Sequence, residues 1–571
     1  MVNDYSILIG GEAGQGSRRA GLIIGKLFSE LGYRIFIYDD YQSLIRGGHN
    51  FSQIRASNQE VLSSRRKIDF LLALDKNTFN QHQKDLDKNG IVIYDDEKVS
   101  FSTRFTKDRK MRFVGLPLKT IVQQAGGAPI MENIALVAGF AKVIGVGWPV
   151  LARILKKEFK KWPDLNLKVA ETGFKGAPKL VRLRKGTNRK SLTLLTGNQA
   201  VCLGAVKAGL IFYFAYPMTP ATGILHYFAK KEKEFGVKTI QMENEIGVIN
   251  AALGAAYAGA RTMVGTSGGG FALMTEALSL AVQSEIPMLI VESQRTGPAT
   301  GVPTYTAQGD LSFVLSAGHG DILKFVIAPG DARQAYFWAG KSLNLAWQCQ
   351  TPVVLLIDKQ VSESTFDFDF GVLNKIKIEK PLIWDRKGEY QRYQNTKNGI
   401  SPLAFPGDKR AVVKATSYEH DEFGLGVEDE KNVALMQNKR LRKFELMKRQ
   451  TECLPAVEVY GKKNSSKAVI VWGSTVGPAR EAAVQMGFKV IQPVIIQPWP
   501  EKQIRRALKG VKRTVLVEAS ATGQLADVLD RYSIKIDPHT KNPGVGVDRK
   551  VLKYDGRPFL PEEIKEKLDS I

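Results

Sequence analysis

YPMTP at residues 216–220, MENEI at 242–246 and QRTGPATG at 294–301 are the segments of sequence that decide the fold. Apolar runs lie between them, and Met288–Val291 is one such run, typical of a parallel strand that is buried on both faces. Ligands of an open α/β sheet bind where strands end and glycine-rich turns begin. The three segments follow predicted strands and contribute a carboxylate, a guanidinium and a threonine hydroxyl. We therefore expect the active surface at this edge of the sheet.

The length and composition of the chain are those of a multidomain protein. Its 571 residues are too many for one hydrophobic core, so three or four domains are expected. Hydrophobic residues make up 44% and charged residues 24%, and no apolar run reaches the ~18 residues of a transmembrane helix. Residues 1–5 also lack the basic and apolar regions of a signal peptide. The sequence predicts a cytoplasmic protein without membrane attachment.

The cysteines exclude a metal cluster built by this chain alone. Cys202, Cys349 and Cys453 are widely separated, and no CxxC pair occurs. Neither a zinc site nor a four-cysteine iron–sulfur cluster fits that spacing. If the reaction moves single electrons, another subunit must hold the clusters.

The formal net charge of +24 indicates either nucleic-acid binding or attraction to anionic partners. The basic residues are spread along the chain, with one dense patch from residue 153 to 190. No helix-turn-helix, zinc finger or aromatic–basic RNA platform accompanies the patch. We favour a solvated, lysine-rich surface and expect no nucleic-acid partner. Coenzyme A, an acidic ferredoxin or an acidic second subunit are the alternative explanations of the charge.

A glycine loop at residues 10–17, GGEAGQGS, lies between two predicted strands at residues 5–9 and 34–38, with a helix after the loop. Such a βαβ opening presents backbone N–H groups at a helix N-terminus, where an anion can bind. Asp39 and Asp40 stand where a nicotinamide dehydrogenase places its ribose-binding acid. The glycine order is GxxGxG and not GxGxxG, which disfavours dinucleotide binding. Tight packing and an anion cradle both remain open.

The three segments quoted first resemble the pyrimidine-binding domain of the α subunits of 2-oxoacid:ferredoxin oxidoreductases. The glycine loop, together with IRGGHN at residues 45–50, resembles the γ domain of the same family, fused here ahead of the α portion. KAVIVWGS at residues 467–474 begins a unit that is similar to the C-terminal domain of transketolase-like enzymes. The resemblance extends over nearly the whole chain.

This resemblance implies an α/β protein of three α/β domains, with a thiamine-diphosphate-binding-type pyrimidine domain in the middle and a transketolase C-terminal-like domain at the end. The expected divisions are a γ-type domain at 1–190, the pyrimidine-binding domain at 191–370, a connector at 371–464 and the C-terminal domain at 465–571. His420 of the connector is flanked by acids, as in some metal sites. Because no distant partner ligand is identifiable, we expect a surface interaction segment there.

The implied reaction is the oxidative decarboxylation of a 2-oxoacid, with the acyl group passed to coenzyme A and electrons passed to ferredoxin. Thiamine diphosphate is the implied cofactor and coenzyme A the co-substrate, and the reaction can also run as reductive carboxylation. The fused γ–α arrangement favours 2-oxoglutarate, giving succinyl-CoA and CO₂. A broad-range 2-oxoacid enzyme or a pyruvate enzyme is the alternative.

Glu245 is the residue on which the implied chemistry depends. In the family, a glutamate of a Glu-x-Glu segment hydrogen-bonds N1′ of the thiamine aminopyrimidine and promotes its imino tautomer by general acid–base catalysis. Glu245 matches that glutamate, and Glu243 is the second choice. Without the surrounding motifs, Glu245 is better explained as a first-turn acid favoured by the helix dipole.

Arg295 and Thr219 match the family's substrate-contacting arginine and threonine. A planar guanidinium holds a carboxylate through two hydrogen bonds, and a threonine hydroxyl orients it. Tyr216 and Pro217 lie in the same loop as Thr219 and are expected at the cofactor.

The γ-type domain carries four further candidate residues, which the resemblance associates with the coenzyme A side of the reaction. They are Gly14, Gly16, Arg46 and His49, expected to form a coenzyme A or interdomain surface. For the histidine, a hydrogen-bonded position in a turn is an equally good explanation.

Part of the expected active site is missing from this sequence. Gly-Asp-Gly, which together with a later asparagine marks the magnesium–diphosphate site of thiamine enzymes, does not occur. Mg²⁺ requires hard oxygen ligands, so no metal ligand is expected in this chain. The resemblance implies a β subunit that carries the diphosphate, Mg²⁺ and an iron–sulfur cluster in an αβ or α₂β₂ assembly. The chain is expected to be catalytic only with that subunit.

Three other classes of function stay open. A nicotinamide-dependent dehydrogenase using the glycine loop is disfavoured by the glycine order. A lipoamide-linked thiamine dehydrogenase subunit is disfavoured by the γ-like fusion. A non-catalytic scaffold that binds coenzyme A, or a partner of the basic patch, is the third.

Overall fold

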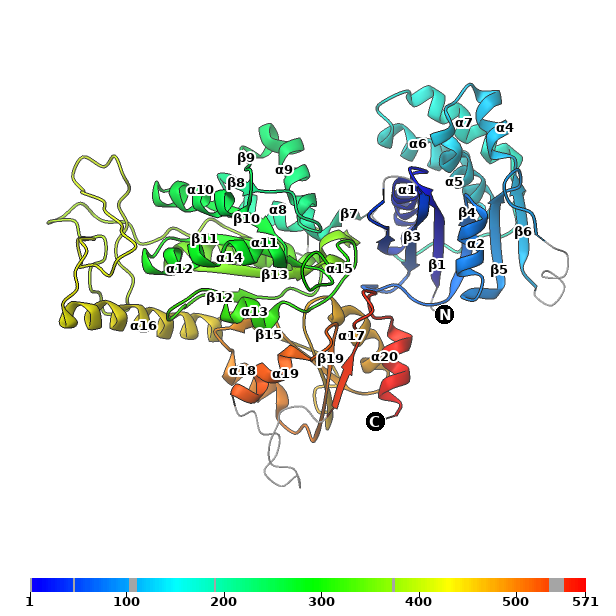
Figure 1. The fold of residues 1–571 in the computed structure, drawn as a ribbon. Coiled ribbons are helices and arrows are strands. Elements are labelled where there is room, and N and C mark those ends of the chain that lie inside the picture. The colour runs from blue at the N-terminus through cyan, green and yellow to red at the C-terminus, as the bar shows by residue number, and fades with distance from the viewer. Residues whose placement is uncertain are drawn as a thin grey trace. The chain divides into compact units, whose positions relative to one another are not determined.

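The computed structural model describes the chain in six stretches, residues 3–44, 47–101, 110–188, 192–371, 375–532 and 549–570. The chain forms two compact units (Figure 1). The N-terminal unit contains residues 1–195, 364–370 and 560–562. The main unit contains residues 196–363, 371–559 and 563–571.

The N-terminal unit is built on an eight-stranded sheet, with strand order β6-β5-β4-β1-β3-β2-β14-β7. In chain order its strands are β1 (Asp4–Ala13), β2 (Arg34–Asp40), β3 (Gly47–Ser57), β4 (Ile68–Ala73), β5 (Leu86–Asp95), β6 (Arg112–Leu116), β7 (Thr193–Thr196) and β14 (Thr365–Phe368). Its helices are α1 (Ser17–Glu30), α2 (Lys76–His82), α4 (Leu118–Ala125), η1 (Pro129–Met131), α5 (Glu132–Val143), α6 (Trp148–Glu158) and α7 (Pro163–Gly176).

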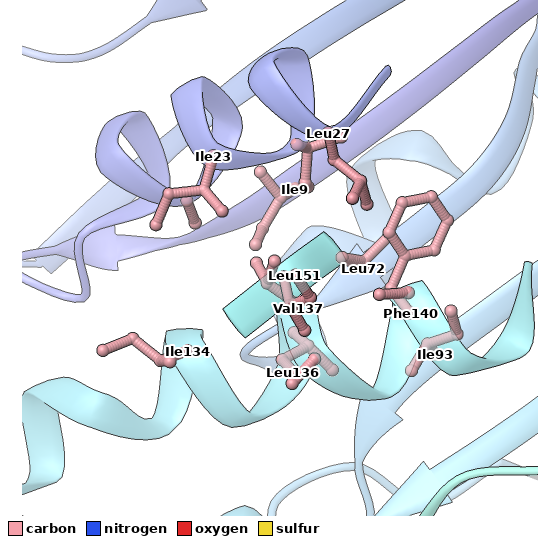
Figure 2. Packing of buried hydrophobic residues seen from close by; sticks show 14 of the residues in the cluster. Ile9, Ile23, Leu27, Leu72, Ile93, Ile134, Leu136, Val137, Phe140 and Leu151 are labelled. Carbon is pink, nitrogen blue, oxygen red and sulfur yellow. The ribbon is translucent and has the colours of Figure 1, made fainter. Parts of the chain in front are cut away.

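One face of this sheet carries the larger core of the unit. Figure 2 shows side chains of α1, α5 and α6 gathered against β1, β4 and β5. Ile9, Leu27 and Phe140 are among them, and each is fully buried. Complete burial of one such side chain stabilises the fold by about 1.5–3 kcal/mol. The apolar run of residues 5–9 therefore forms a strand, as its sequence indicates.

Strand β3 differs from the βαβ opening expected from the sequence. It lies between β1 and β2 and is antiparallel to both, so these two strands are not neighbours. Its buried polar residues are paired across the sheet: Gln53 Nε2 donates to Ser6 Oγ at 3.0 Å, and Arg55 forms an ion pair with Asp4 at 2.7 Å. Because these side chains are polar, residues 47–57 lack the apolar pattern of a buried strand.

The main unit contains a seven-stranded sheet in the order β18-β12-β13-β11-β10-β8-β9 and a five-stranded sheet in the order β15-β17-β16-β19-β20. Strands of the first are β8 (Phe212–Ala215), β9 (Lys238–Gln241), β10 (Thr262–Thr266), β11 (Met288–Gln294), β12 (Phe325–Ile327), β13 (Pro352–Asp358) and β18 (Ile495–Gln497). Strands of the second are β15 (Val457–Gly461), β16 (Lys467–Val471), β17 (Lys489–Pro493), β19 (Arg513–Glu518) and β20 (Arg549–Leu552).

The helices that flank these two sheets complete the element order. They are α8 (Gly197–Lys207), α9 (Thr222–Phe235), α10 (Glu245–Tyr257), α11 (Gly268–Leu273), α12 (Thr275–Gln283), α13 (Leu311–Ser316), α14 (Ala332–Cys349), α15 (Lys359–Glu363), α16 (Glu430–Cys453), η2 (Gly473–Thr475), α17 (Val476–Gln485), α18 (Glu501–Leu508), α19 (Gln524–Arg531) and α20 (Pro561–Leu568).

The seven-stranded sheet is covered on both faces. Successive side chains of β11 enter opposite cores, with Met288 and Ile290 in one and Leu289 and Val291 in the other. Strands β8 to β13 pair in parallel, and β18 joins antiparallel to β12. The α/β architecture expected from the apolar runs is confirmed.

The connector at residues 371–464 is more deeply anchored than its charged sequence indicates. His420 is buried and stacks on Tyr393 with ring centroids 3.7 Å apart, so the expected surface position is wrong for this residue. Helix α16 brings Lys439 and Lys443 to the carboxylate of Glu285, at 2.6 and 2.5 Å. Ion pairs and stacking fix this segment, and neither produces an apolar pattern.

Within the part of the chain that the structure describes, every helix is too short or too polar to traverse a lipid bilayer.

Candidate active site

Four parallel strands of the main unit end at one edge of the seven-stranded sheet. Ala215 of β8 is level with Gln241 of β9 and Gly265 of β10, and Gly265 is level with Val291 of β11. The segments that follow these strands are those quoted from the sequence, together with TSGGG at residues 266–270. The carboxyl ends of parallel strands are where α/β proteins bind ligands.

Glu245 is the first residue of α10. Asn244 precedes it as the N-cap, and its side chain accepts a hydrogen bond from the N–H of Gly247 at 2.9 Å. The Glu245 side chain is only 3% exposed, and among the described residues its Oε1 has no hydrogen-bond partner. Glu243 is exposed. A buried carboxylate oxygen without a donor is costly for a fold to keep, so this atom is a candidate to receive a ligand group.

A glycine of α11 leaves room beside this carboxylate. A Cβ at Gly270 would lie 2.5 Å from Glu245 Oε1 and 2.1 Å from Thr266 Oγ1. Both distances are shorter than any van der Waals contact, so a larger residue at this position displaces the carboxylate or the hydroxyl. The neighbouring Gly269 faces open space.

Arg295 and Thr219 are brought together at the same edge. Arg295 Nη1 donates a hydrogen bond to the carbonyl oxygen of Thr219 at 2.8 Å. Asn198 Nδ2 donates to the carbonyl of the next residue, Pro220, at 2.9 Å. The loop between β8 and α9 is thus held at two successive carbonyls. Tyr216 lies in this loop with 39% of its surface exposed, and Pro217 is also exposed.

A pair of carboxyl groups stands behind Arg295. Glu292 is completely buried at the end of β11, and burial raises its pKa well above the usual range, with Asp310 and Asp358 adding repulsion. Burial also raises the pKa of Asp310, although the interaction with Glu292 and the attraction of Arg295 oppose this shift. Neither carboxyl oxygen of Glu292 has a hydrogen-bond partner among the described residues. Arg295 therefore lies beside two acidic groups whose pKa values are both raised.

The two glycines of the N-terminal loop have different surroundings. Both have positive φ, 97° at Gly14 and 76° at Gly16. A Cβ at Gly16 would lie 2.3 Å from Asn133 Nδ2, whereas no atom of the described residues lies within 4 Å of the same position at Gly14. Tight packing therefore explains Gly16, and no described residue fills the space beside Gly14.

His49 lies inside the N-terminal unit, at 5% exposure. Its Nε2 is 2.9 Å from Nε2 of His82, and its ring stacks on Phe51. Burial lowers the pKa of His49, and burial together with its neighbour lowers the pKa of His82 to about 3. Both rings are therefore neutral at physiological pH. Arg46 lies outside the described residues.

Comparison with known proteins shows which family this arrangement belongs to. Residues 203–439 match the family model described as pyruvate flavodoxin/ferredoxin oxidoreductase, thiamine diphosphate-binding, and residues 6–176 match the model of pyruvate ferredoxin/flavodoxin oxidoreductase. The α subunit of 2-oxoacid:ferredoxin oxidoreductase 2 from Aeropyrum pernix is 31% identical over 98% of this chain and 96% of its own length. The chain belongs to the 2-oxoacid:ferredoxin oxidoreductase α-subunit family.

Two further relatives agree with this assignment. The 2-oxoglutarate synthase subunit KorA of Archaeoglobus fulgidus is 30% identical over 66% of this α subunit and 98% of its own length. The solved structure of 2-oxoglutarate:ferredoxin oxidoreductase from Magnetococcus marinus, with 2-oxoglutarate, coenzyme A and succinyl-CoA bound, is similar over 99% of both chains. Its TM-score is 0.88 at 28% identity. The resemblance inferred from the sequence is confirmed.

Gln199 lies in the first turn of α8, the helix that precedes β8. Its side-chain Oε1 accepts from the N–H of Thr196 at 2.9 Å, and its own N–H donates to Thr196 Oγ1 at 3.2 Å. These bonds form a capping box at the start of α8, in which glutamine and glutamate are interchangeable. Gln199 therefore stabilises the start of α8.

Four residues near this edge of the sheet were not predicted as site residues from the sequence: Thr266, Gly270, Glu292 and Asp310. A glycine run after an apolar strand was a signal for Gly270. An acid at the end of the buried strand Met288–Gln294 was the corresponding signal for Glu292. Nothing local marks Asp310, because its partner Glu292 lies on another element.

Proposed function

We propose that this α subunit works in the cytoplasm with a β subunit to oxidise 2-oxoglutarate to succinyl-CoA and CO₂, passing the electrons to ferredoxin. The observation that carries the mechanism is the buried Glu245 carboxylate, whose Oε1 lies beside Gly270 and has no donor among the residues that the structure describes. The choice of 2-oxoglutarate is supported by the names of the Magnetococcus marinus and Archaeoglobus fulgidus relatives. The full-length Aeropyrum pernix relative carries the broader name, which favours a broad-range 2-oxoacid enzyme as the second candidate.

The residues at this edge fit the aminopyrimidine of thiamine diphosphate. Glu245 would hold a proton at the ring nitrogen N1′, and Gly270 allows the carboxylate to lie close against α11, because a Cβ there would meet Glu245 Oε1 at 2.5 Å. When bound, the cofactor supplies a nucleophilic carbon and a sink for the electrons released by decarboxylation. The contribution of this chain is to keep the Glu245 carboxylate dry and correctly placed, because α10 and its Asn244 cap fix its position.

Arg295 would hold the carboxylate of the 2-oxoacid. Its Nη1 donates a hydrogen bond to the Thr219 carbonyl, and this bond fixes the direction of the guanidinium before substrate binds. Thr219 would direct its hydroxyl to the substrate from a loop that is held at two carbonyls.

A composite active site is supported by the apolar surface beside Glu245. Ile246 is 53% exposed next to the glutamate, Leu273 is 51% exposed on α11, and Phe313, which touches Phe271 of α11, is 36% exposed. Apolar side chains gathered at one place mark surfaces that bind partners. We propose that the β subunit covers them in an αβ or α₂β₂ assembly and brings Mg²⁺, the diphosphate site and an iron–sulfur cluster.

The N-terminal unit is proposed to serve coenzyme A through the loop of Gly14 and Gly16 and the following Arg46 and His49. Gly14 supports this role because the space beside its backbone is open. The buried His49 would support the loop indirectly, by holding the start of β3 against His82. The domain divisions at 190, 370 and 464 are part of the same proposal.

The test is an anaerobic assay of the chain co-purified with its partner, using 2-oxoglutarate, coenzyme A and a one-electron dye. We expect dye reduction that requires thiamine diphosphate and coenzyme A, and none from the α subunit alone. A higher kcat/KM for 2-oxoglutarate than for pyruvate supports the proposed substrate, and equal values support the broad-range candidate. Nicotinamide reduction by the α subunit alone would contradict the proposal.

A further inference from the structure

The loop that follows Arg295 is closed on itself. Residues 296–306, here called the clamp loop, begin and end at adjacent positions. The N–H of Thr296 donates to the carbonyl of Tyr305 at 3.1 Å, and Thr296 Oγ1 donates to the carbonyl of Thr306 at 3.1 Å. Val302 N–H donates back to the carbonyl of Thr296 at 2.9 Å. The position of Arg295 therefore depends on what holds the two ends of this loop.

A segment some 250 residues later in the chain touches both ends of the clamp loop. This segment, residues 553–559 (KYDGRPF), is called the C-terminal corner. The carbonyl of Gly556 accepts a hydrogen bond from the N–H of Thr306 at 3.1 Å. A Cβ at Gly556 would lie 3.2 Å from Tyr305 Cβ and 3.3 Å from Thr296 Oγ1. Gly556 also has a φ of 78°, which favours glycine, so both its conformation and its contacts fit this position.

Arg557 adds a second contact with the same loop. Its guanidinium lies 3.7 Å from the centroid of the Tyr305 ring. Tyr305 is only 7% exposed, so the ring presents a fixed surface to the cation. Cation–π contacts of this kind are favourable and directional. The contact holds Tyr305, whose carbonyl accepts the hydrogen bond from Thr296.

The C-terminal corner is itself fixed to the C-terminal sheet. The N–H of Lys553 donates to the carbonyl of Glu518 in β19 at 3.2 Å, and its ammonium group binds Glu563 at 2.7 Å. Asp555 Oδ1 accepts from the N–H of Arg557 at 2.9 Å. The C-terminal corner is fixed to the sheet, and the clamp loop is closed on itself. The corner therefore restricts the position of Arg295, the residue that precedes Thr296.

Gln308 joins the same two parts just beyond the clamp loop. It exchanges two hydrogen bonds with Ala519, at 2.6 and 2.7 Å, and its Nε2 donates to the carbonyl of Trp472 at 2.7 Å. The side chain is completely buried. The stretch from residue 296 to 308 is thus held at three places: by the C-terminal corner at Tyr305 and Thr306, and by the ends of β16 and β19 at Gln308.

We propose that Gly556 and Arg557 are positioning residues for the 2-oxoacid, and that the C-terminal domain holds Arg295 in its binding direction through the clamp loop. The inference rests on the proposed function, in which Arg295 holds the substrate carboxylate. Small displacements of a substrate-holding group weaken catalysis strongly. The C-terminal domain of this chain thus takes part in substrate binding as well as in packing.

The test measures kcat, the KM for 2-oxoglutarate and the KM for coenzyme A on the co-purified complex, together with its melting temperature. We expect Arg557→Ala and Tyr305→Ala each to raise the KM for 2-oxoglutarate by about tenfold. The KM for coenzyme A stays near that of the wild type in both variants. The melting temperature of Arg557→Ala also stays near the wild type, whereas Tyr305→Ala lowers it because the ring is buried. Tyr305→Phe keeps the ring and Arg557→Lys keeps the charge, so both recover most of the affinity.

Two further variants make the outcome decisive. Tyr554→Ala, in the same corner but 70% exposed, is the matched control and leaves the KM for 2-oxoglutarate unchanged. Arg557→Ala combined with Tyr305→Ala has no larger effect than either change alone, because the two residues act through one contact. A KM for 2-oxoglutarate that is unchanged in Arg557→Ala, or one that rises together with the KM for coenzyme A, overturns the inference.

Arg295→Ala in the same complex separates this inference from the function on which it rests. A raised KM for 2-oxoglutarate in Arg295→Ala, with no change in Arg557→Ala, overturns the positioning role alone. An unchanged KM in Arg295→Ala overturns the substrate role of that arginine and the positioning role with it.

Discussion

Glu245 and Glu285 are both buried glutamates of the main unit, and their carboxylates have opposite surroundings. Glu285 is completely buried, and its two oxygens bind Lys439 and Lys443 at 2.6 and 2.5 Å. Glu245 is 3% exposed, and its Oε1 has no partner among the described residues. Burial is therefore shared by a residue that holds the fold together and a residue that we propose serves a ligand. The hydrogen-bond partners of the buried carboxylate oxygens distinguish the two.

The largest expected effect is the loss of activity in Glu245→Gln. An amide at this position cannot exchange a proton with N1′ of the cofactor, and general acid–base groups contribute about 10²- to 10⁴-fold to rates. We expect kcat of the assembled complex to fall by that factor, with the melting temperature unchanged. Glu243→Gln is the matched control, two residues away and exposed, and keeps kcat within a few-fold of the wild type. A large loss in the control alone would assign the role to Glu243.

The second effect is the loss of stability in Glu285→Gln. The change leaves two buried ammonium groups facing a neutral amide, and breaking a buried ion pair in this way costs about 3–5 kcal/mol. We expect the free energy of unfolding in urea to fall by that amount, while kcat of the folded complex stays near the wild type. Glu445→Gln on the same helix removes a pair with Lys448 that is about half exposed, and changes stability by less than about 1 kcal/mol.

The third effect tests the space beside Glu245. Gly270→Ala places a methyl group 2.5 Å from the present position of Glu245 Oε1, so the carboxylate must move. We expect kcat to fall by about tenfold or more, since a displaced catalytic group loses its alignment. Gly269→Ala, at an open position of the same helix, leaves kcat near the wild type. Equal activities of the two variants would show that the glycine is not needed for catalysis.

The smallest effect is the pH dependence of the Glu285 cluster. Burial alone would raise the pKa of Glu285, but the attraction of Lys439, Lys443 and Arg392 outweighs it and holds the pKa far below its ordinary value of 4.5. The unfolded chain therefore binds a proton at this residue near pH 4.5, whereas the folded chain does not. The stability that Glu285 contributes is complete above that pH and is lost as the pH falls. The difference in unfolding free energy between wild type and Glu285→Gln should narrow from pH 6 to pH 3.5.

The sequence was sufficient to predict that the candidate residues follow strands of one sheet, but not to predict the residues that support them. Glu245, Arg295 and Thr219 follow apolar strands, and the ends of parallel strands meet at one edge, so their proximity could be predicted. The capping box of Thr196 and Gln199 is a local pattern, whereas the interaction of Glu292 with Asp310 joins residues of different elements. Strand β3 was not predicted, because its buried side chains are polar and are paired with polar side chains of β1. The cluster of Glu285 with α16 joins residues 154 and 158 positions apart, a distance that no local pattern spans.

The most direct test of the account compares Glu245→Gln and Glu285→Gln in one preparation of the assembled complex. Both kcat with 2-oxoglutarate and the free energy of unfolding are measured for each variant. We expect opposite results for the two variants. Glu245→Gln loses activity and keeps its stability, whereas Glu285→Gln loses stability and keeps its activity per folded complex. If Glu245→Gln instead retains activity within a few-fold of the wild type, the buried carboxylate without a partner is not the catalytic group, and the central claim is wrong.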